Sequence, residues 1–278
     1  MRPRVVIAAA AALYLLAGSG CFLRDRWFGT VTPPPDQVVT ASHQTTPADR
    51  RIQLHTRLIE QPHGHDYLTR GLWADAVDPL PPELSARLAA NGLRVGVISG
   101  SVPDELENLG RTAAISPMLR TVQVDQPKTV PVNGPIESVT VLVRAEPTST
   151  PQPKQFERVE CGVMVTSTPT ADGRVRLRCE PRMQHGSRRP YFQPTADGFD
   201  REDRRPTEEF PALAWEVMLS ASDVLVVGST AEPDDDALGA AFFLARTPDR
   251  WRQRVFTLQA TSTAPTPAAR GVTAALVR

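Results

Sequence analysis

The segment His63-Gly64-His65-Asp66 brings together two imidazoles and a carboxylate, which are groups that zinc accepts as ligands. Metal-dependent hydrolases place such ligands in a loop after a strand, where the metal activates water. The rest of the chain adds little, because the other histidines, His43, His55 and His185, form no second cluster. We therefore expect a surface loop here and treat His63, His65 and Asp66 as weak metal candidates.

A second polar concentration runs from Glu232 to Asp236 and holds four acidic residues ahead of an apolar run. Oxygen-rich loops of this kind bind calcium, but the regular spacing of an EF-hand loop is missing. Acids placed directly before a helix also cap its first turn and suit its dipole. A solvated loop or a helix cap is the expected role.

The motifs of common enzyme classes are missing from the sequence. Ser99 stands one place too late for a nucleophile elbow, and Gly92, Gly96 and Gly100 match neither a P-loop nor a dinucleotide fingerprint. No set of nucleophile, base and acid is visible. Enzymatic activity is therefore the least favoured function, and no cofactor is expected.

The stretch 187–209 is rich in arginine and carries interleaved acids. Its arginines are Arg188, Arg189, Arg201, Arg204 and Arg205, and Asp200, Glu202 and Asp203 lie among them. The whole chain is also balanced, with 31 Lys and Arg against 31 Asp and Glu, so no field attracts nucleic acid. We expect a solvated loop, with an interaction surface as the alternative.

The first 21 residues have the three parts of an export signal. Arg2 and Arg4 give a positive start, an apolar run follows at 5–17, and small residues lead to Cys21. The apolar run is too short to span a bilayer comfortably. The arrangement resembles a bacterial lipoprotein signal, in which the cysteine becomes the first mature residue, although Gly18 stands where a leucine is usual.

Lipidation of Cys21 predicts an exported protein that is anchored in a membrane and faces the periplasm or the cell exterior. Several acyl chains on one cysteine give stable attachment, because each buried CH₂ contributes about 0.8 kcal/mol. Cleavage with release and an uncleaved anchor are the alternatives. Residues 22–50 are polar and rich in proline, which predicts an extended tether.

The other two cysteines, Cys161 and Cys179, lie in segments whose apolar residues alternate with polar ones, as in half-buried strands. If the segments pair as a hairpin with Val165 opposite Val175, the two cysteines face each other. An oxidising compartment then favours a disulfide between them. Two buried free thiols are the alternative.

Packed structure is expected from residue 51, as an α+β subdomain at 51–145 and a β-rich subdomain at 156–260, with a Pro/Ala-rich tail at 261–278. Expected strands lie at 52–58, 93–98, 136–144, 213–219 and 224–228, and expected helices at 82–90 and 103–109. The apolar runs 240–244 and 255–258 are expected to complete a sheet, and 146–155 to form a loop.

Proline is the unusual component of the composition, with 27 among 278 residues, about twice the usual share. Prolines at this density break long helices, which excludes a helical bundle or solenoid. The hydrophobic fraction of 41% is too high for a wholly disordered chain. The expected fold class is mainly β (α+β) with a few short helices, in an antiparallel sheet or sandwich.

Several segments resemble a recurring block in uncharacterised exported bacterial proteins. They are 72–78, 88–96, 180–186 and 223–228, and the last also resembles a strand of the secretin β-domain that follows a turn. These segments cover a small part of the chain. The resemblance supplies no activity, and the secretin-like segment is too short to assign a pore.

The sequence thus favours a non-enzymatic envelope lipoprotein with a structural, assembly or interaction role. Its expected partners are the membrane, through the N-terminal lipid, and an envelope protein, but not nucleic acid. A small-molecule or glycan-binding module on the same anchor is the alternative, and it requires a pocket with convergent polar groups.

Overall fold

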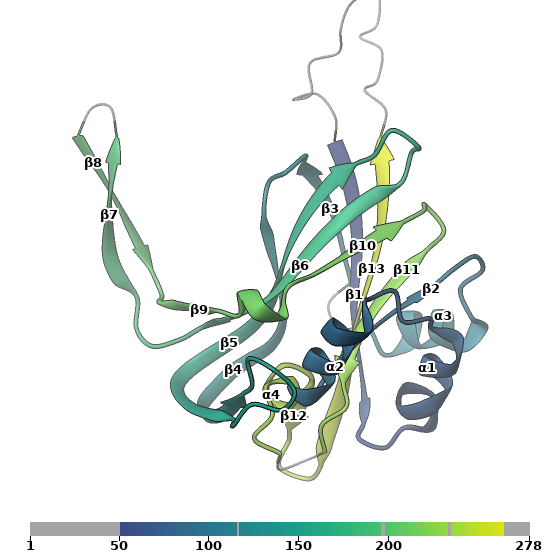
Figure 1. Cartoon of the computed structure of the whole chain (residues 1–278), viewed down its shortest axis with the longest axis horizontal. Helices are drawn as coiled ribbons and strands as arrows, with labels where there is room; N and C mark the ends of the chain where they lie inside the picture. The colour runs from purple at the N-terminus through teal and green to yellow at the C-terminus, as the bar shows by residue number, and fades with distance from the viewer. Residues whose placement is uncertain (1–50, 116, 196–197, 233–234, 264–278) are drawn as a thin grey trace, which may run out of the picture. The chain divides into compact units, whose positions relative to one another are not determined.

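The computed structural model describes residues 51–263, except 116, 196–197 and 233–234 (Figure 1). The signal at 1–21 with Cys21, the tether at 22–50 and the tail from 264 onward lie outside these residues. Strands account for 55% and helices for 18% of the structure, which confirms the expected mainly β fold with antiparallel sheets. Within the described range, no helix is long and apolar enough to cross a membrane.

The larger sheet is built around the first and last described strands. β1 (Arg51–Pro62) pairs antiparallel with β13 (Trp251–Thr263) along its 12 residues. The strand order is β2-β11-β13-β1-β3, and β12 pairs with β13. The other bounds are β2 Leu93–Ile98, β3 Met118–Gln123, β11 Val224–Ser229 and β12 Leu244–Arg246.

The second sheet has the order β10-β6-β5-β4, with the short β9 beside β6. Its bounds are β4 Lys128–Val143, β5 Gln152–Pro169, β6 Val175–Gln184, β9 Thr207–Glu209 and β10 Trp215–Leu219. One buried apolar cluster contains Leu54 and Phe256 of the larger sheet together with Val163 and Leu177 of the smaller one. The two sheets therefore share a core, as in a β-sandwich.

Helical segments cover the other face of the larger sheet. They are η2 (Tyr67–Gly71), α1 (Leu72–Asp75) and α3 (Asp104–Thr112). Trp73 joins Val226 and Val255 of the sheet in a second apolar cluster, and its indole N–H donates to the carbonyl of Leu68 at 3.0 Å. A Cβ at Gly228 would lie 3.0 Å from Cζ2 of Trp73, so glycine leaves the space that the indole needs.

The helix α2 (Pro82–Ala90) and the strand β2 have the bounds that the sequence predicted. Asn91 follows α2, and its side-chain amide exchanges two hydrogen bonds with the backbone of Arg144, each 2.9 Å long. Gly92 comes next with a φ of +73°, a left-handed conformation that favours glycine. This corner also contacts α4 (Leu238–Phe243), because Gly239 N–H donates to the Asn91 carbonyl at 2.8 Å.

Several predicted elements need correction. The run 240–244 was expected to be a strand, but most of it lies in α4, because an unbroken apolar run shows neither strand nor helix periodicity. The strand expected at 136–144 begins at Lys128, and β5 begins at Gln152 inside the expected loop 146–155. The helix α3 continues past the predicted end at 109 and includes Gly110.

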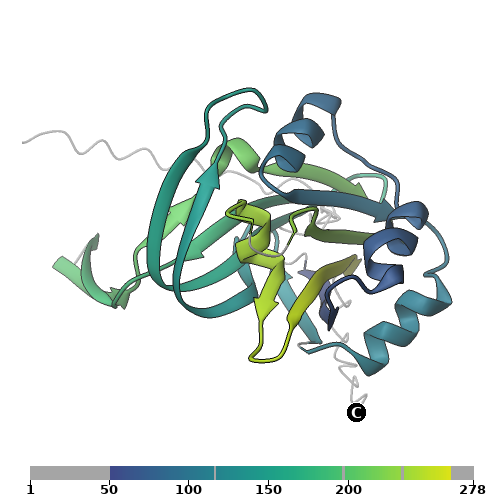
Figure 2. The same cartoon turned by 90° about the horizontal axis from the view of Figure 1, so that it is seen from below.

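The charged stretch 187–209, expected to be a loop, contains β9 and two further strands. β7 (Arg189–Thr195) and β8 (Gly198–Arg204) pair as a separate two-stranded sheet, here called the arm (Figures 1 and 2). Nearly every residue of the arm is exposed, so neither strand needs the apolar alternation that marks a half-buried strand.

The two expected subdomains do not form separate sheets. β1, β2 and β3 come from 51–145, yet they share a sheet with β11 and β13 from the later segment. In the same way, β4 from the first segment pairs with β5 from the second. The described strands therefore belong to one compact unit.

The cysteine segments do form a hairpin, β5 and β6, but with a different register. Val165 lies opposite Cys179, and Cys161 lies opposite Met183. The offset of four residues separates the cysteines by about 13 Å along the strands, well beyond the span of a disulfide. The expected Cys161–Cys179 disulfide is absent here; both thiols are free and buried, and burial raises the pKa of the Cys179 thiol to about 12.

Candidate functional site

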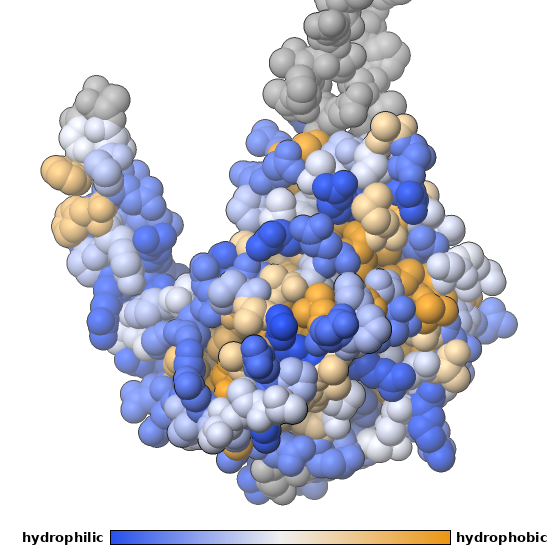
Figure 3. Space-filling view, in the orientation of Figure 1, coloured by the Kyte–Doolittle hydropathy of each residue, from blue (hydrophilic) through white to orange (hydrophobic). Residues whose placement is uncertain are grey.

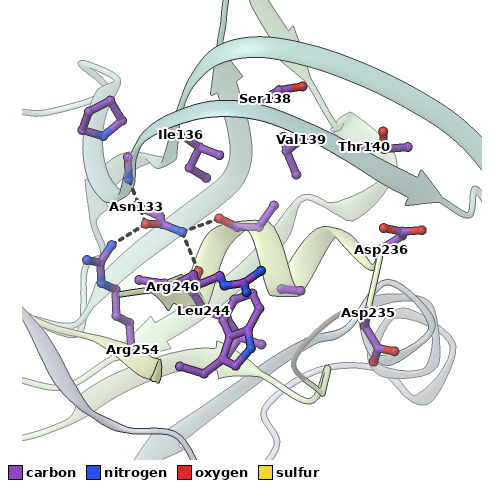
Figure 4. A pocket seen from close by; sticks show the side chains of 16 residues that line it. Asn133, Ile136, Ser138, Val139, Thr140, Asp235, Asp236, Leu244, Arg246 and Arg254 are labelled. Atoms are coloured by element: carbon purple, nitrogen blue, oxygen red, sulfur yellow. Dashed lines mark hydrogen bonds between the residues drawn. The ribbon is translucent and has the colours of Figure 1, made fainter. Parts of the chain in front are cut away.

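A cavity of about 640 Å³ lies between the bent part of β4 and the segment formed by α4, β12 and the start of β13 (Figure 4). Figure 2 shows the curved β4 and β5 next to α4 and β12. Ile136, Ser138 and Thr140 of β4 line one wall, and Arg246 and Trp251 line the opposite one. We call this cavity the β4 groove.

The bend in β4 results from an irregular pairing with β5. The register shifts on both sides of Asn133, and Gly134 has a φ of +128°. The Asn133 side-chain nitrogen donates to the carbonyls of Ala241 at 2.7 Å and Leu244 at 2.9 Å, while its oxygen accepts from Gly134 N–H at 2.9 Å. Asn133 therefore holds α4 against the bend and has little capacity left for a ligand.

Arg254 lies at the same end of the groove and connects the two sheets. From β13 it donates to the carbonyl of Val132 at 3.3 Å and to the side-chain oxygen of Asn133, both on β4. Its Nε also donates to Glu60 Oε2 at 2.8 Å. The charge of Arg254 is thus largely neutralised inside the protein.

Glu60 lies between two arginines of β13. Its second oxygen accepts from Arg252 Nε at 3.1 Å, and its side chain is 15% exposed. Burial raises the pKa of Glu60, but the hydrogen bonds and positive charges of Arg254 and Arg252 outweigh this effect, so the pKa lies below its ordinary value. Glu60 remains ionised and stabilises the arginine pair.

The remaining polar groups of the groove are accessible. The exposed Arg246 guanidinium lies 5.7 Å from the centre of the Trp251 ring. Asp235 and Asp236 lie on the same side of the groove as Thr140, away from Arg254 (Figure 4). An indole, a cation and two carboxylates around one cavity can bind a polar molecule that also presents a flat apolar face.

The arm is the second feature with accessible chemistry. The register places Phe192 opposite Arg201 and Pro194 opposite Phe199, so these residues share one face of the hairpin. Phe192 is 63% exposed and Phe199 is 76% exposed. Figure 3 shows apolar side chains gathered on the arm. On the opposite face, the Arg204 guanidinium lies 4.2 Å from the centre of the Tyr191 ring.

The structure does not bring the candidate metal ligands His63, His65 and Asp66 together in one site. His63 Nε2 lies 3.9 Å from Glu232 Oε2, whereas Asp66 pairs with Arg70 at 2.6 Å. Among the described residues, no group of three histidine, cysteine or acidic side chains is close enough to hold a metal ion. In the acidic segment, Glu232 N–H donates to the Asp235 carboxylate at 2.9 Å, and no side chain caps α4.

Comparison with known proteins gives no family. No family model matches the chain, and no curated protein matches it. Among solved structures, the chain has weak similarity to a secretin.

The chain resembles the InvG secretin domain β-barrel from the Salmonella SPI-1 injectisome, with 11% identity and a TM-score of 0.22, over 80% of this chain and 65% of that one. A second structure of the secretin InvG gives 11% identity and a TM-score of 0.19, over 80% and 67%. A structure of the basal body proteins InvG, PrgH and PrgK gives 11% identity and a TM-score of 0.19, over 80% of this chain and 48% of that one. Scores this low establish neither a shared fold nor a shared function.

We predict that Glu60→Gln lowers the free energy of unfolding at neutral pH by about 2 kcal/mol, because it removes a carboxylate bonded to two arginines. The folded-state pKa of Glu60 lies below its unfolded value. Its contribution is therefore present above the unfolded pKa and is lost as the pH falls through the folded pKa. Urea unfolding should show the difference between wild type and variant shrinking as the pH falls below the ordinary pKa of a glutamate.

Asp66→Asn is the matched control. The Asp66–Arg70 pair is short but its side chains are 86% and 78% exposed, so its loss should change stability by less than about 0.5 kcal/mol. Equal stability of Glu60→Gln and wild type at neutral pH would contradict the role given to Glu60.

Proposed function

We propose that this protein is a non-enzymatic envelope lipoprotein with an assembly or interaction role, and that the arm is its contact element. The observation that carries this proposal is the exposure of Phe192 and Phe199 on a sheet of only two strands. An isolated two-stranded hairpin is marginally stable in water. A partner that covers the apolar face of the arm would shield the two phenylalanine rings from water and would also stabilise the hairpin.

The envelope location rests on the sequence of the first 21 residues. The positive start, the short apolar run and Cys21 support export followed by lipid attachment. The proline-rich tether then separates the folded body from the membrane.

A photoreactive amino acid at Phe199 should cross-link in living cells to give an adduct heavier than the single chain, because the apolar face lies in the contact. The same group at Leu119, which is 67% exposed on β3, should give none. Electrophoresis of the envelope fraction measures both, and an additional Phe192→Ser change should abolish the adduct. Equal adducts at the two positions, or none at Phe199, would contradict the proposal.

Cys21→Ser should release the protein from the membrane, because it removes the only thiol placed to accept the lipid. Fractionation of cells, with metabolic labelling by a fatty acid, measures this. Gly18→Leu, which restores the usual lipoprotein pattern, is the control and should stay bound. A Cys21→Ser protein that remains in the membrane fraction would rule out a lipid anchor.

The β4 groove supports a second function, the binding of a small molecule or glycan. Its volume is in the range of small-molecule sites, and Trp251 with Asp235 and Asp236 gives it the combination of ring and carboxylates that sugars use. This function requires the accessible end of the groove and not the arm.

Calorimetric titration with tetra-N-acetylchitotetraose tests the glycan function. We predict binding to the wild type that weakens at least about tenfold in Trp251→Ala, because the sugar ring loses its stacking surface. Phe192→Ala on the arm is the control and should bind as the wild type does. The absence of heat with the wild type would remove this glycan function.

A further inference from the structure

The two outer edges of the arm differ in their capacity to pair. Pro190 lies opposite Asp203 and Pro194 lies opposite Phe199. Proline has no N–H, so these are the pairs of the ladder that exchange no hydrogen bonds. The backbone of Pro190 and Pro194 therefore points away from β8, and the outer edge of β7 lacks two of its donors.

The outer edge of β8 is open. In the same alternation, Phe199, Arg201 and Asp203 direct their N–H and C=O groups away from β7. No third strand pairs with this edge in the part of the chain that the structure describes. An exposed strand edge with free donors and acceptors is a template for another strand. Prolines thus hinder the pairing of a further strand at the outer edge of β7, and the outer edge of β8 has no such protection.

The charges along β8 are complementary to those of a second copy of β8 that runs antiparallel to it. The strand reads Asp200-Arg201-Glu202-Asp203-Arg204, and none of these side chains is buried. If two copies of β8 pair antiparallel about Glu202, Arg201 lies opposite Asp203 of the second copy. Asp200 then lies opposite Arg204 of the second copy, and symmetry repeats both pairs.

This register also allows the outward-facing backbone groups of the two copies to form hydrogen bonds with each other. Arg201 and Asp203 both direct their backbone groups outward, so facing each other they exchange hydrogen bonds as an antiparallel pair does. A shift by two residues in either direction places Arg201 or Asp203 opposite its own copy. Like charges directly opposite destabilise a sheet. The register centred on Glu202 has one such pair, Glu202 with its own copy, whereas the shifted registers add Asp200 opposite Glu202 or Arg201 opposite Arg205, so the register centred on Glu202 is favoured.

We propose that the arm binds the arm of a second copy of this chain through the outer edge of β8, in a symmetric four-stranded sheet β7-β8-β8-β7. This rests on the proposed function of the arm as a contact element and names its partner. Phe192 and Phe199 of both copies then lie on one face of the sheet. Within each copy, Arg201 already lies 3.3 Å from Asp203, so the contact joins two such pairs into one network.

The interface is small, which predicts weak pairing in dilute solution. Two copies held on one membrane by lipid anchors meet at a much higher effective concentration. The arm is thus suited to an association that forms on the membrane. The one unfavourable feature is Glu202 opposite its own copy, a like-charge pair that limits affinity.

Disulfide trapping tests the register. Glu202→Cys places two thiols across the symmetry axis in a pair without hydrogen bonds, with Cα atoms about 4.5 Å apart, within disulfide reach. The full lipidated chain is kept in isolated membranes, where the anchors hold the copies at high effective concentration and the lipidated Cys21 offers no free thiol. Air with copper(II) phenanthroline oxidises the two thiols, and non-reducing electrophoresis should show a covalent dimer.

Two controls share the exposure of Glu202 and its face of the arm. Asp200→Cys places the thiols four residues apart along the strands, about 13 Å, and Gln193→Cys places them on the two outer strands. Both should form little dimer. Cys161 and Cys179 are buried, and burial raises the pKa of both thiols, so they do not compete.

Charge reversal tests the complementarity. In the Glu202→Cys background, Arg201→Asp alone and Asp203→Arg alone should each reduce the dimer yield at least about tenfold, because each creates two like-charge pairs. A mixture of these two variants, co-expressed in one cell, should regain the yield as a heterodimer, since each Asp then faces an Arg. Two tags of different size distinguish the heterodimer from the homodimers.

Equal yields from Glu202→Cys, Asp200→Cys and Gln193→Cys, or the absence of a Glu202→Cys dimer, would overturn self-pairing. So would single reversals without effect, or a mixture that regains nothing. If Phe199 cross-links in cells to a different protein while Glu202→Cys forms no dimer, the arm remains a contact element and only self-pairing fails. If neither occurs, the proposed function fails as well.

Discussion

The pairing of β1 with β13 is the constraint on which the described structure depends. Directly or through one neighbour, these two strands hold every other strand of the larger sheet. Ile52 and Leu54 of β1 face the shared core, while Ile59 joins the cluster under the helices. The strands come from opposite ends of the described chain, so their pairing closes a long loop, and its entropic cost grows only slowly with loop length. Burial on both faces of the sheet offsets that cost.

The second sheet depends on this pairing through one polar connection. Arg254 and Glu60 lie on β13 and β1 in adjacent strands, and Arg254 reaches β4 at Val132 and Asn133. Asn133 in turn bonds the backbone of α4. The bend in β4 that shapes the groove is therefore fixed by groups from three strands and a helix. A partly buried network of this kind is stable because its polar atoms have partners.

The sequence predicted the elements with clear local signals and missed features that depend on distant residues. α2 and β2 have the predicted bounds because Pro82 and the Asn91-Gly92 pair mark a start and a stop. Alternation correctly placed Cys161 and Cys179 on the buried face of a hairpin, but it fixes the face and leaves the register to the turn. Glu60, Asn133 and Arg254 are far apart in sequence, and only the glycine–proline pair after Asn133 signals an irregular strand.

The excess of proline has a structural consequence in the arm that composition alone does not reveal. Pro190 and Pro194 block one edge of a two-stranded sheet and leave the other edge open. A sheet open on both sides adds strands without limit, which leads to fibres. When two such arms join through β8, each new outer edge is a proline-bearing β7, so the symmetric contact closes at two copies. The same residues that make the chain a poor helix former therefore limit how far its exposed sheet can grow.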